Sequence, residues 1–335
     1  MQIQLNIHIF AFVRCRFGIL LSIIAFIELA QTGCQHAVSS NPITQNLKAT
    51  ELIVLGTIQD AGSPHIACKN DCCKKLFKSP DYSRKVVSLG LVDHEYEQSW
   101  MFEATPDISA QLKLLKEFSP FNTIETPNGI FLTHAHVGHY SGLMYLGREA
   151  MSAKSVPVYA MPKMAKFLGS NGPWNQLLNL NNIVIKPLQD NLEVQLSSKL
   201  SVKPILVPHR DEYSETVGYL ISGPNKKALF IPDIDKWGKW TKNIIDEINH
   251  VDYAFIDATF FDAEELNNRD MSEIPHPFIV ETMQLLKDQP ATEKSKIYFI
   301  HFNHTNPLLN PKSRQTKAVL KAGFNIAYFK QKFVL

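Results

Sequence analysis

The sequence has little net charge of either sign. Its 34 lysines and arginines nearly balance 32 aspartates and glutamates, which gives a formal net charge of +2. It also lacks the basic runs interleaved with aromatic residues that are typical of nucleic-acid-binding segments. A polyanionic partner is therefore not indicated, and we expect a small-molecule substrate and no nucleic acid.

Apolar runs of bilayer-spanning length are also missing, because the run from Phe17 to Ile27 is short and Glu28 follows it. No internal repeat stands out at the periods of solenoid proteins, and no linker divides residues 50–335. A chain of 335 residues with ordinary apolar content can bury one substantial core or two small ones. We therefore predict a single folded domain.

The first 34 residues have the composition of an export signal. Arg14 and Arg16 precede the apolar run, and small residues follow it. Thr32-Gly33-Cys34 resembles the end of a bacterial lipobox, which would make Cys34 a lipidated first residue. Gln31 stands where that motif usually has leucine, so a lipoprotein signal and a cleaved secretory signal both remain open, with an uncleaved anchor as a third alternative.

The chain thus divides into three predicted parts. We expect a signal peptide or lipoprotein signal over residues 1–34, a polar linker over 35–50, and a metallohydrolase-like domain over 51–335. Each interpretation of the N-terminus places the domain outside the cytoplasm. We expect an exported protein, periplasmic or lipid-anchored in the cell envelope, that meets the membrane only through its N-terminal signal or lipid anchor.

Cysteines are few. The sequence has five, and removal of a signal leaves Cys68, Cys72 and Cys73, plus Cys34 if cleavage precedes it. Three cysteines cannot all pair within one chain. Their spacing fits no standard zinc ribbon, so three interpretations remain: a structural metal site with His65 as fourth ligand, one disulfide with a spare thiol, or incidental cysteines in a loop.

What the sequence does contain is a group of three histidines directly after an apolar strand. Ile130 to Leu132 is predicted as a buried strand, and His134, His136 and His139 follow it. Residues two apart in extended backbone point to the same side, so His134 and His136 can face one point. Imidazole is the commonest metal ligand, and a catalytic zinc needs three protein ligands and one open position. The pattern predicts a metal site at the carboxyl edge of a sheet.

This stretch resembles the His-x-His-x-Asp-His signature of the metallo-β-lactamase superfamily. The resemblance implies the α/β (α+β) class, a four-layer αβ/βα sandwich in a single domain, with one or two metal ions at one edge of two facing sheets. One position departs from the signature, because Gly138 stands where the family has the aspartate that ligates the second metal. The first metal site is therefore better supported than the second.

The resemblance extends to later strands that end in histidine or aspartate. It implies His134, His136 and His209 for the first metal, with His139, Asp233 and His301 for the second and Asp233 as a bridge. Spacing does not separate close neighbours, so Asp235 competes with Asp233, and His304 with His301.

The implied chemistry is hydrolysis. A zinc ion held by such ligands lowers the pKa of bound water to about 7 and supplies hydroxide at neutral pH. Asp233 would serve catalysis through the metals. His276 resembles a proton-donating histidine of some phosphodiesterase branches and would act as general acid, although a plain loop histidine fits equally well. Asp257 is expected to orient a ligand or to accept hydrogen bonds from backbone N–H groups.

A closer resemblance covers most of residues 50–335. The pyrroloquinoline quinone biosynthesis protein B branch is similar to this chain in Gly142 to Glu149, Pro157 to Ala160 and Asn303 to Pro307. The loop with Cys68, Cys72 and Cys73, here called the cysteine loop, also resembles that branch. That branch is tied to cofactor synthesis and to an iron-dependent oxidative role. Its members tend to lack several hydrolytic histidines, whereas this chain keeps His134, His136, His209 and His301.

We therefore expect a metal-dependent hydrolase that uses metal-bound hydroxide on a phosphoester, ester or amide. The cofactor would be one or two zinc ions, with iron or manganese as alternatives because imidazole and carboxylate suit them too. An iron-dependent oxidative enzyme of cofactor biosynthesis is the first alternative. A non-catalytic exported metal-binding protein is the second.

Overall fold

A computed structural model describes residues 49–265 and 273–335. The predicted signal over residues 1–34 lies outside the described residues, and so does nearly all of the predicted linker. Within the part of the chain that is described, no helix is long and apolar enough to cross a bilayer.

Two seven-stranded sheets form the centre of the domain. The first has the order β14 (Lys332–Val334), β1 (Thr50–Gly56), β2 (Ser88–Asp93), β3 (Gln98–Phe102), β4 (Gly129–Phe131), β5 (Val156–Ala160) and β6 (Ile183–Pro187). The second has the order β13 (Asn325–Ile326), β12 (Ile297–Ile300), β11 (Tyr253–Asp257), β10 (Lys227–Ile231), β9 (Val217–Ser222), β8 (Leu200–Leu206) and β7 (Val194–Ser197).

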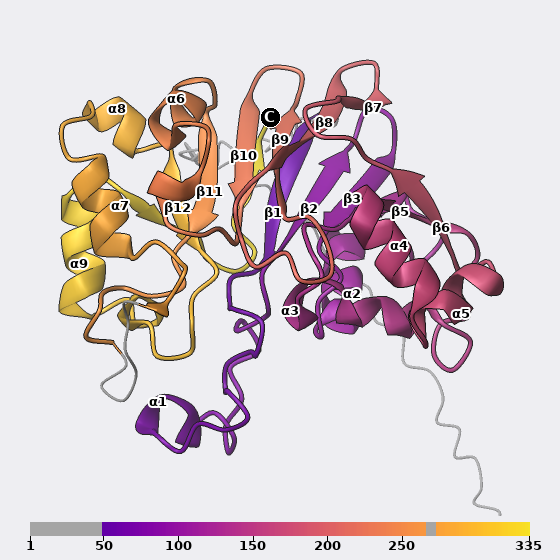
Figure 1. The fold of residues 1–335 in the computed structure, drawn as a ribbon, viewed down its shortest axis with the longest axis horizontal. Coiled ribbons are helices and arrows are strands. Elements are labelled where there is room, and N and C mark those ends of the chain that lie inside the picture. Colours follow the sequence, from indigo (N-terminus) through magenta and orange to yellow (C-terminus); the bar gives the residue numbers. More distant parts are fainter. Residues whose placement is uncertain (1–48, 266–272) are drawn as a thin grey trace, which may run out of the picture. The chain divides into compact units, whose positions relative to one another are not determined.

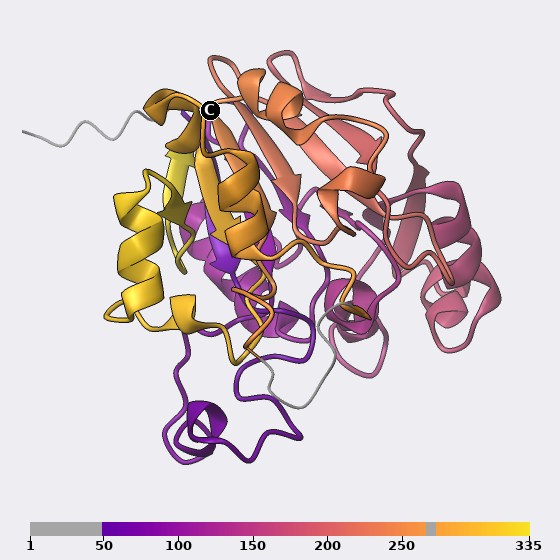
Figure 2. The same ribbon diagram turned by 60° about the vertical axis from the view of Figure 1, so that its left-hand side comes forward.

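Helices cover the outer face of each sheet (Figure 1). On the first sheet these are α2 (Ile108–Phe118), α3 (Val137–Tyr140), η1 (Ser141–Leu146), α4 (Pro162–Ser170) and α5 (Trp174–Asn179). On the second they are η2 (Trp237–Lys239), α6 (Ile244–Asn249), α7 (Ile279–Leu285), α8 (Ala291–Lys294), η4 (Pro307–Leu309) and α9 (Arg314–Lys321). The turned view in Figure 2 brings the orange and yellow helices in front of the second sheet. The predicted four-layer αβ/βα sandwich in one domain is confirmed.

Three buried apolar layers hold the sandwich together. The layer between the sheets is rich in aromatic rings, and the ring of Phe131 stacks on that of Tyr159 at 4.1 Å and on that of Phe102 at 5.1 Å. Because Phe131 is fully buried, its replacement by alanine would cost about 3–5 kcal/mol of stability. This layer fixes β4, and therefore the start of the histidine loop.

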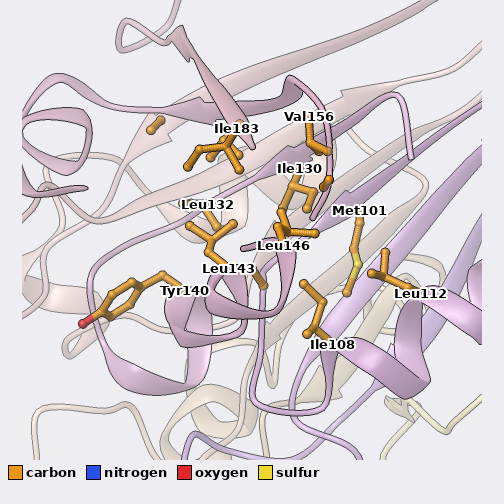
Figure 3. Packing of buried hydrophobic residues seen from close by; sticks show 14 of the residues in the cluster. Met101, Ile108, Leu112, Ile130, Leu132, Tyr140, Leu143, Leu146, Val156 and Ile183 are labelled. Carbon is orange, nitrogen blue, oxygen red and sulfur yellow. The ribbon is translucent and has the colours of Figure 1, made fainter. Parts of the chain in front are cut away.

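The second layer lies between the first sheet and its helices (Figure 3). Ile108, Leu112 and Leu115 recur at helical spacing, so one face of α2 packs against Met101 and Ile130 in the sheet. A third layer under α6, α7 and α9 covers the second sheet in the same way.

Strand direction determines where the site forms. β4 is parallel to β3, and β1 has the same direction because it is antiparallel to β2, which is antiparallel to β3. In the second sheet β10, β11 and β12 are parallel, and β8 shares their direction through antiparallel β9. Residues that follow β1 and β4, or β8, β10, β11 and β12, therefore emerge at a common edge of their sheet.

Candidate metal centre

The first ligand group comes from three of these strand ends. His134 and His136 follow β4, His209 follows β8 and Asp233 follows β10, and each offers one ligand atom within 4.8 Å of the others. The Nε2 atoms of His134 and His209 lie 3.4 and 3.3 Å from the carboxylate of Asp233, and Nδ1 of His136 lies 3.9 Å from it. The structure thus brings together the residues predicted for a first metal.

A second ligand group shares Asp233. It consists of Asp60, His139, Asp233 and His301, again with ligand atoms within 4.8 Å of one another. The Oδ1 atom of Asp60 lies 2.9 Å from Nε2 of His139 and 3.3 Å from Nε2 of His301. Nε2 of His139 lies 3.9 Å from Oδ2 of Asp233.

Asp60 is the functional candidate that the sequence did not reveal. It follows β1, so it shares with Asp233 the pattern of an acidic residue shortly after an apolar strand. That pattern was its only signal, since nothing near Asp60 in the sequence resembles a ligand motif.

The chemistry of the first group fits a cation. Nε2 of His134, Nδ1 of His136, Nε2 of His209 and Oδ1 of Asp233 are buried, and within the described residues none has a partner in hydrogen-bonding geometry. Buried polar atoms are normally satisfied, so a set of convergent unsatisfied atoms needs an explanation. A divalent metal ion bound by imidazole and carboxylate supplies one.

Further hydrogen bonds orient the imidazoles from behind. The hydroxyl of Thr133 lies 2.8 Å from Nδ1 of His134 and donates to Glu103. Nδ1 of His209 lies 3.2 Å from Asp235. The hydroxyl of Thr259 lies 2.8 Å from Nδ1 of His301. Such contacts fix which nitrogen of a ligand faces the metal.

His276 also reaches this edge. Its Nδ1 atom lies 2.8 Å from Oδ2 of Asp257 and 3.1 Å from Oδ1 of Asp233. With His301 these three residues form a third group that could hold a metal. His276 lies in the loop before α7 (Ile279–Leu285), and its role as general acid stays a prediction.

The pKa values of His134 and His139 are shifted in opposite directions. Burial and the neighbouring His139 lower the pKa of His134 well below its ordinary value. Burial also opposes charge on His139, but Asp60 and Glu103 outweigh it and raise the pKa of His139 well above the ordinary value. The first group therefore presents a neutral His134, and the second a protonated His139.

Asp235 and His304, the alternatives to Asp233 and His301, lie outside the two main ligand groups. Asp235 contacts Nδ1 of His209 and Nζ of Lys239 and is in neither of the two main ligand groups. His304 is not in a ligand group with His301; it follows β12, and its ring nitrogen groups with the sulfur atoms of the three cysteines.

The cysteine loop contains α1 (Asp71–Lys74), which Figure 1 shows apart from the layers. Cys68, Cys72 and Cys73 are free, and their sulfur atoms lie together with a ring nitrogen of His304 in a fourth ligand group. His65, the sequence-based candidate for fourth ligand, is not in that group. Its ring centroid lies 4.5 Å from that of His304 with the planes tilted by 31°, and its backbone N–H donates to the sulfur of Cys73.

Known proteins support the fold and the family. A family model described as the beta-lactamase superfamily domain matches residues 100–302. The coenzyme PQQ synthesis protein B of Methylococcus capsulatus is 24% identical over 82% of this chain and 96% of its own length. That of Methylobacillus flagellatus is 25% identical over 82% of this chain and 96% of its own length.

Solved structures show the same architecture. Zn²⁺-bound PqqB from Methylobacterium extorquens superimposes with a TM-score of 0.69 at 21% identity, over 85% of this chain and 100% of that one. A diphosphatase from the PhnP family does so with a TM-score of 0.59 at 20% identity, over 85% and 97% of the two chains. The resemblance to the protein B branch, expected from the sequence, is thereby confirmed, and the chain belongs to the β-lactamase superfamily domain family.

Proposed function

We propose that this protein is a metal-dependent hydrolase that acts on a phosphoester, ester or amide of a small molecule. The observation that carries the proposal is the pair of ligand groups that share Asp233. Paired metal sites of this kind are typical of hydrolytic enzymes that clamp both the attacking and the leaving oxygen. Bound zinc would polarise a substrate oxygen and lower the pKa of a bound water.

The side chains of the site have separate tasks in this proposal. The imidazoles and Asp233 hold the cations, while Thr133, Asp235 and Thr259 keep their ligands oriented. His136 and Asp60 are the more exposed ligands, with side chains 14% and 12% exposed against 3% or less for His134 and Asp233. Substrate therefore approaches from the side of His136 and Asp60.

His276 is placed to move a proton. Its Nδ1 atom faces Asp257 and Asp233, and these carboxylates outweigh burial and raise its pKa well above the ordinary value. A protonated imidazole beside the metal ligands is suited to donate a proton to a leaving oxygen.

A second candidate function comes from the relatives. Coenzyme PQQ synthesis protein B matches this chain over 96% of its own length, which favours a step in the synthesis of that cofactor. In this candidate function the same ligands would hold iron for an oxidative reaction. Imidazole and carboxylate bind Fe²⁺ as well as Zn²⁺, so the ligand types serve both candidates.

Elemental analysis and two assays separate the candidates. The full chain is purified without added metal, its zinc, iron and manganese are counted, and it is assayed on p-nitrophenyl phosphodiesters, phosphomonoesters and esters and in an oxygen electrode. Zinc with hydrolysis that chelation abolishes is the expected result. Predominant iron with oxygen uptake and no hydrolysis would overturn the proposal in favour of the second candidate, and a metal-free protein would overturn both.

A further inference from the structure

We infer that Asp60 supplies the carboxylate for a second metal that the superfamily signature places at residue 138. The inference rests on the metal binding in the proposed function and is independent of hydrolysis. Gly138 has no side chain to offer, yet the second ligand group still contains two imidazoles and two carboxylates. One of these carboxylates belongs to Asp60, which lies 78 positions earlier in the sequence.

Asp60 occupies the space that a side chain at residue 138 would need. A Cβ atom built on Gly138 would lie 2.4 Å from Cα of Asp60 and 2.8 Å from both its Cβ and its carboxyl carbon. Real Cβ atoms do not make such contacts, and the nearest atom is backbone that cannot swing away. The backbone of Gly138 is not left-handed, so close approach, and not conformation, requires glycine here.

The backbone holds Asp60 beside His301. The N–H of Gln59 donates to the carbonyl of Phe302, and the N–H of Phe302 donates to the carbonyl of Thr57. Asp60 and His301 are the direct neighbours of this bonded pair. The carboxylate is thus fixed by the ladder between the first loop and the end of β12, and not by a flexible side chain alone.

A purely structural ion pair is the competing explanation for this contact. Asp60 lies 2.9 Å from His139, and a carboxylate that only balances a protonated histidine would leave metal content unchanged when it is removed. The two explanations therefore differ in the number of metal ions bound and not only in stability.

The test counts metal in the full chain. Wild type and the isosteric variant Asp60→Asn are stripped with a chelator, titrated with zinc and analysed for bound zinc per chain, with near-ultraviolet circular dichroism to verify folding. Asp93→Asn is the control, because Asp93 is a buried, hydrogen-bonded aspartate that ends β2 at the opposite edge of the sheet. We expect Asp60→Asn to bind one zinc fewer than wild type and the control to bind the same number.

A second variant tests the packing. Gly138→Ala leaves Asp60 in the sequence but displaces it, so we expect the loss of the same zinc. Gly169→Ala is its control, because a Cβ there meets only an ordinary contact of 3.7 Å. Unchanged zinc content in folded Asp60→Asn, or in Gly138→Ala, would overturn the inference. Full zinc loading without hydrolysis in wild type would instead count against the proposed function alone.

Discussion

The Nδ1 atom of His139 lies 3.2 Å from Oε1 of Glu103, and both side chains are completely buried. Glu103 has a left-handed backbone with φ of 75°, a conformation that costs about 1–3 kcal/mol and is concentrated at functional sites. The same carboxylate accepts the hydroxyl of Thr133. Glu103 therefore positions the imidazole of His139 toward the second ligand group.

The variant Glu103→Gln is expected to weaken binding at that group. Glutamine keeps the shape but removes the charge that orients His139, and loss of such a contact typically lowers metal affinity about 10–100-fold. Zinc titration by calorimetry measures the change, with partly exposed Glu51→Gln as control. Equal affinity in both variants would show that Glu103 has no influence on the metal.

Alanine at His134 or His136 is expected to remove the first metal. Each substitution deletes an imidazole from a group of four ligands, and zinc sites depend on their full ligand set. Bound zinc per chain is the readout, and exposed His250→Ala is the control. Full metal content in both variants would mean that the first site is assigned to the wrong residues.

Metal binding at the second group is expected to release more protons than binding at the first. Burial opposes charge on His301, but Asp257 and Asp60 outweigh it and raise its pKa, and the pKa of His139 is raised too. Both imidazoles must lose a proton to bind a metal, whereas His134 is already neutral.

The affinity of the second group should therefore rise with pH through neutrality. Without metal, the stability of the fold depends on pH in the opposite direction. The raised pKa of His139 in the folded state stabilises the fold below about pH 6.5, and this stability is lost as pH rises through the folded pKa. Calorimetry in buffers of different ionisation enthalpy counts the protons. Equal release for both zinc ions would contradict the expectation.

The variant Glu265→Gln is expected to alter the pH dependence of stability. Burial raises the pKa of Glu265 to about 7 from an ordinary value of 4.5. The folded state therefore favours the protonated carboxyl, whose contribution is full below pH 4.5 and is lost as pH rises to about 7. Relative to wild type, the variant should gain about 1–3 kcal/mol between pH 5 and pH 8. Urea unfolding of both proteins at the two pH values, at equal metal content, gives the difference, and parallel curves would refute it.

His304 and His65 make a matched pair for the cysteine loop. His304→Ala should release one zinc and expose the loop around α1 to proteolysis, because His304 completes the group of three sulfur atoms. His65→Ala should keep that zinc, since His65 is not in the ligand group and the variant retains the backbone N–H that donates to Cys73. Zinc loss in His65→Ala alone would reverse the assignment.

The sequence predicted the sandwich and most of the ligand edge because a short motif in it resembles the metallo-β-lactamase signature. His134, His136 and His139 follow one strand within six residues, and short apolar runs identify the strands that carry Asp233 and His301. These local patterns can be read from the sequence without knowing which strands pair in each sheet.

The roles of Asp60 and His304 as ligands could not be predicted from the sequence, and the physical reason is the same for both. Acidic residues after strands are common, and the pairing of Ile58 with Phe302 is what brings Asp60 beside His301. Proximity in sequence favoured His65 as partner of the cysteines, but the loop after β12 delivers His304 instead. Both positions depend on pairing between segments that are far apart in the sequence, and local sequence patterns do not show which segments pair.

The contact between Asp60 and His301 also bears on the order in which the protein assembles. It joins residues 241 positions apart, against 79 for Asp60 and His139, so closing the larger loop costs about 1 kcal/mol more in chain entropy. Contacts of such separation slow folding, because the loop-closure entropy is lost before the contact contributes. A cation bound by both Asp60 and His301 would link the two ends of the domain. It could bind both residues only after the last strands of the second sheet have formed.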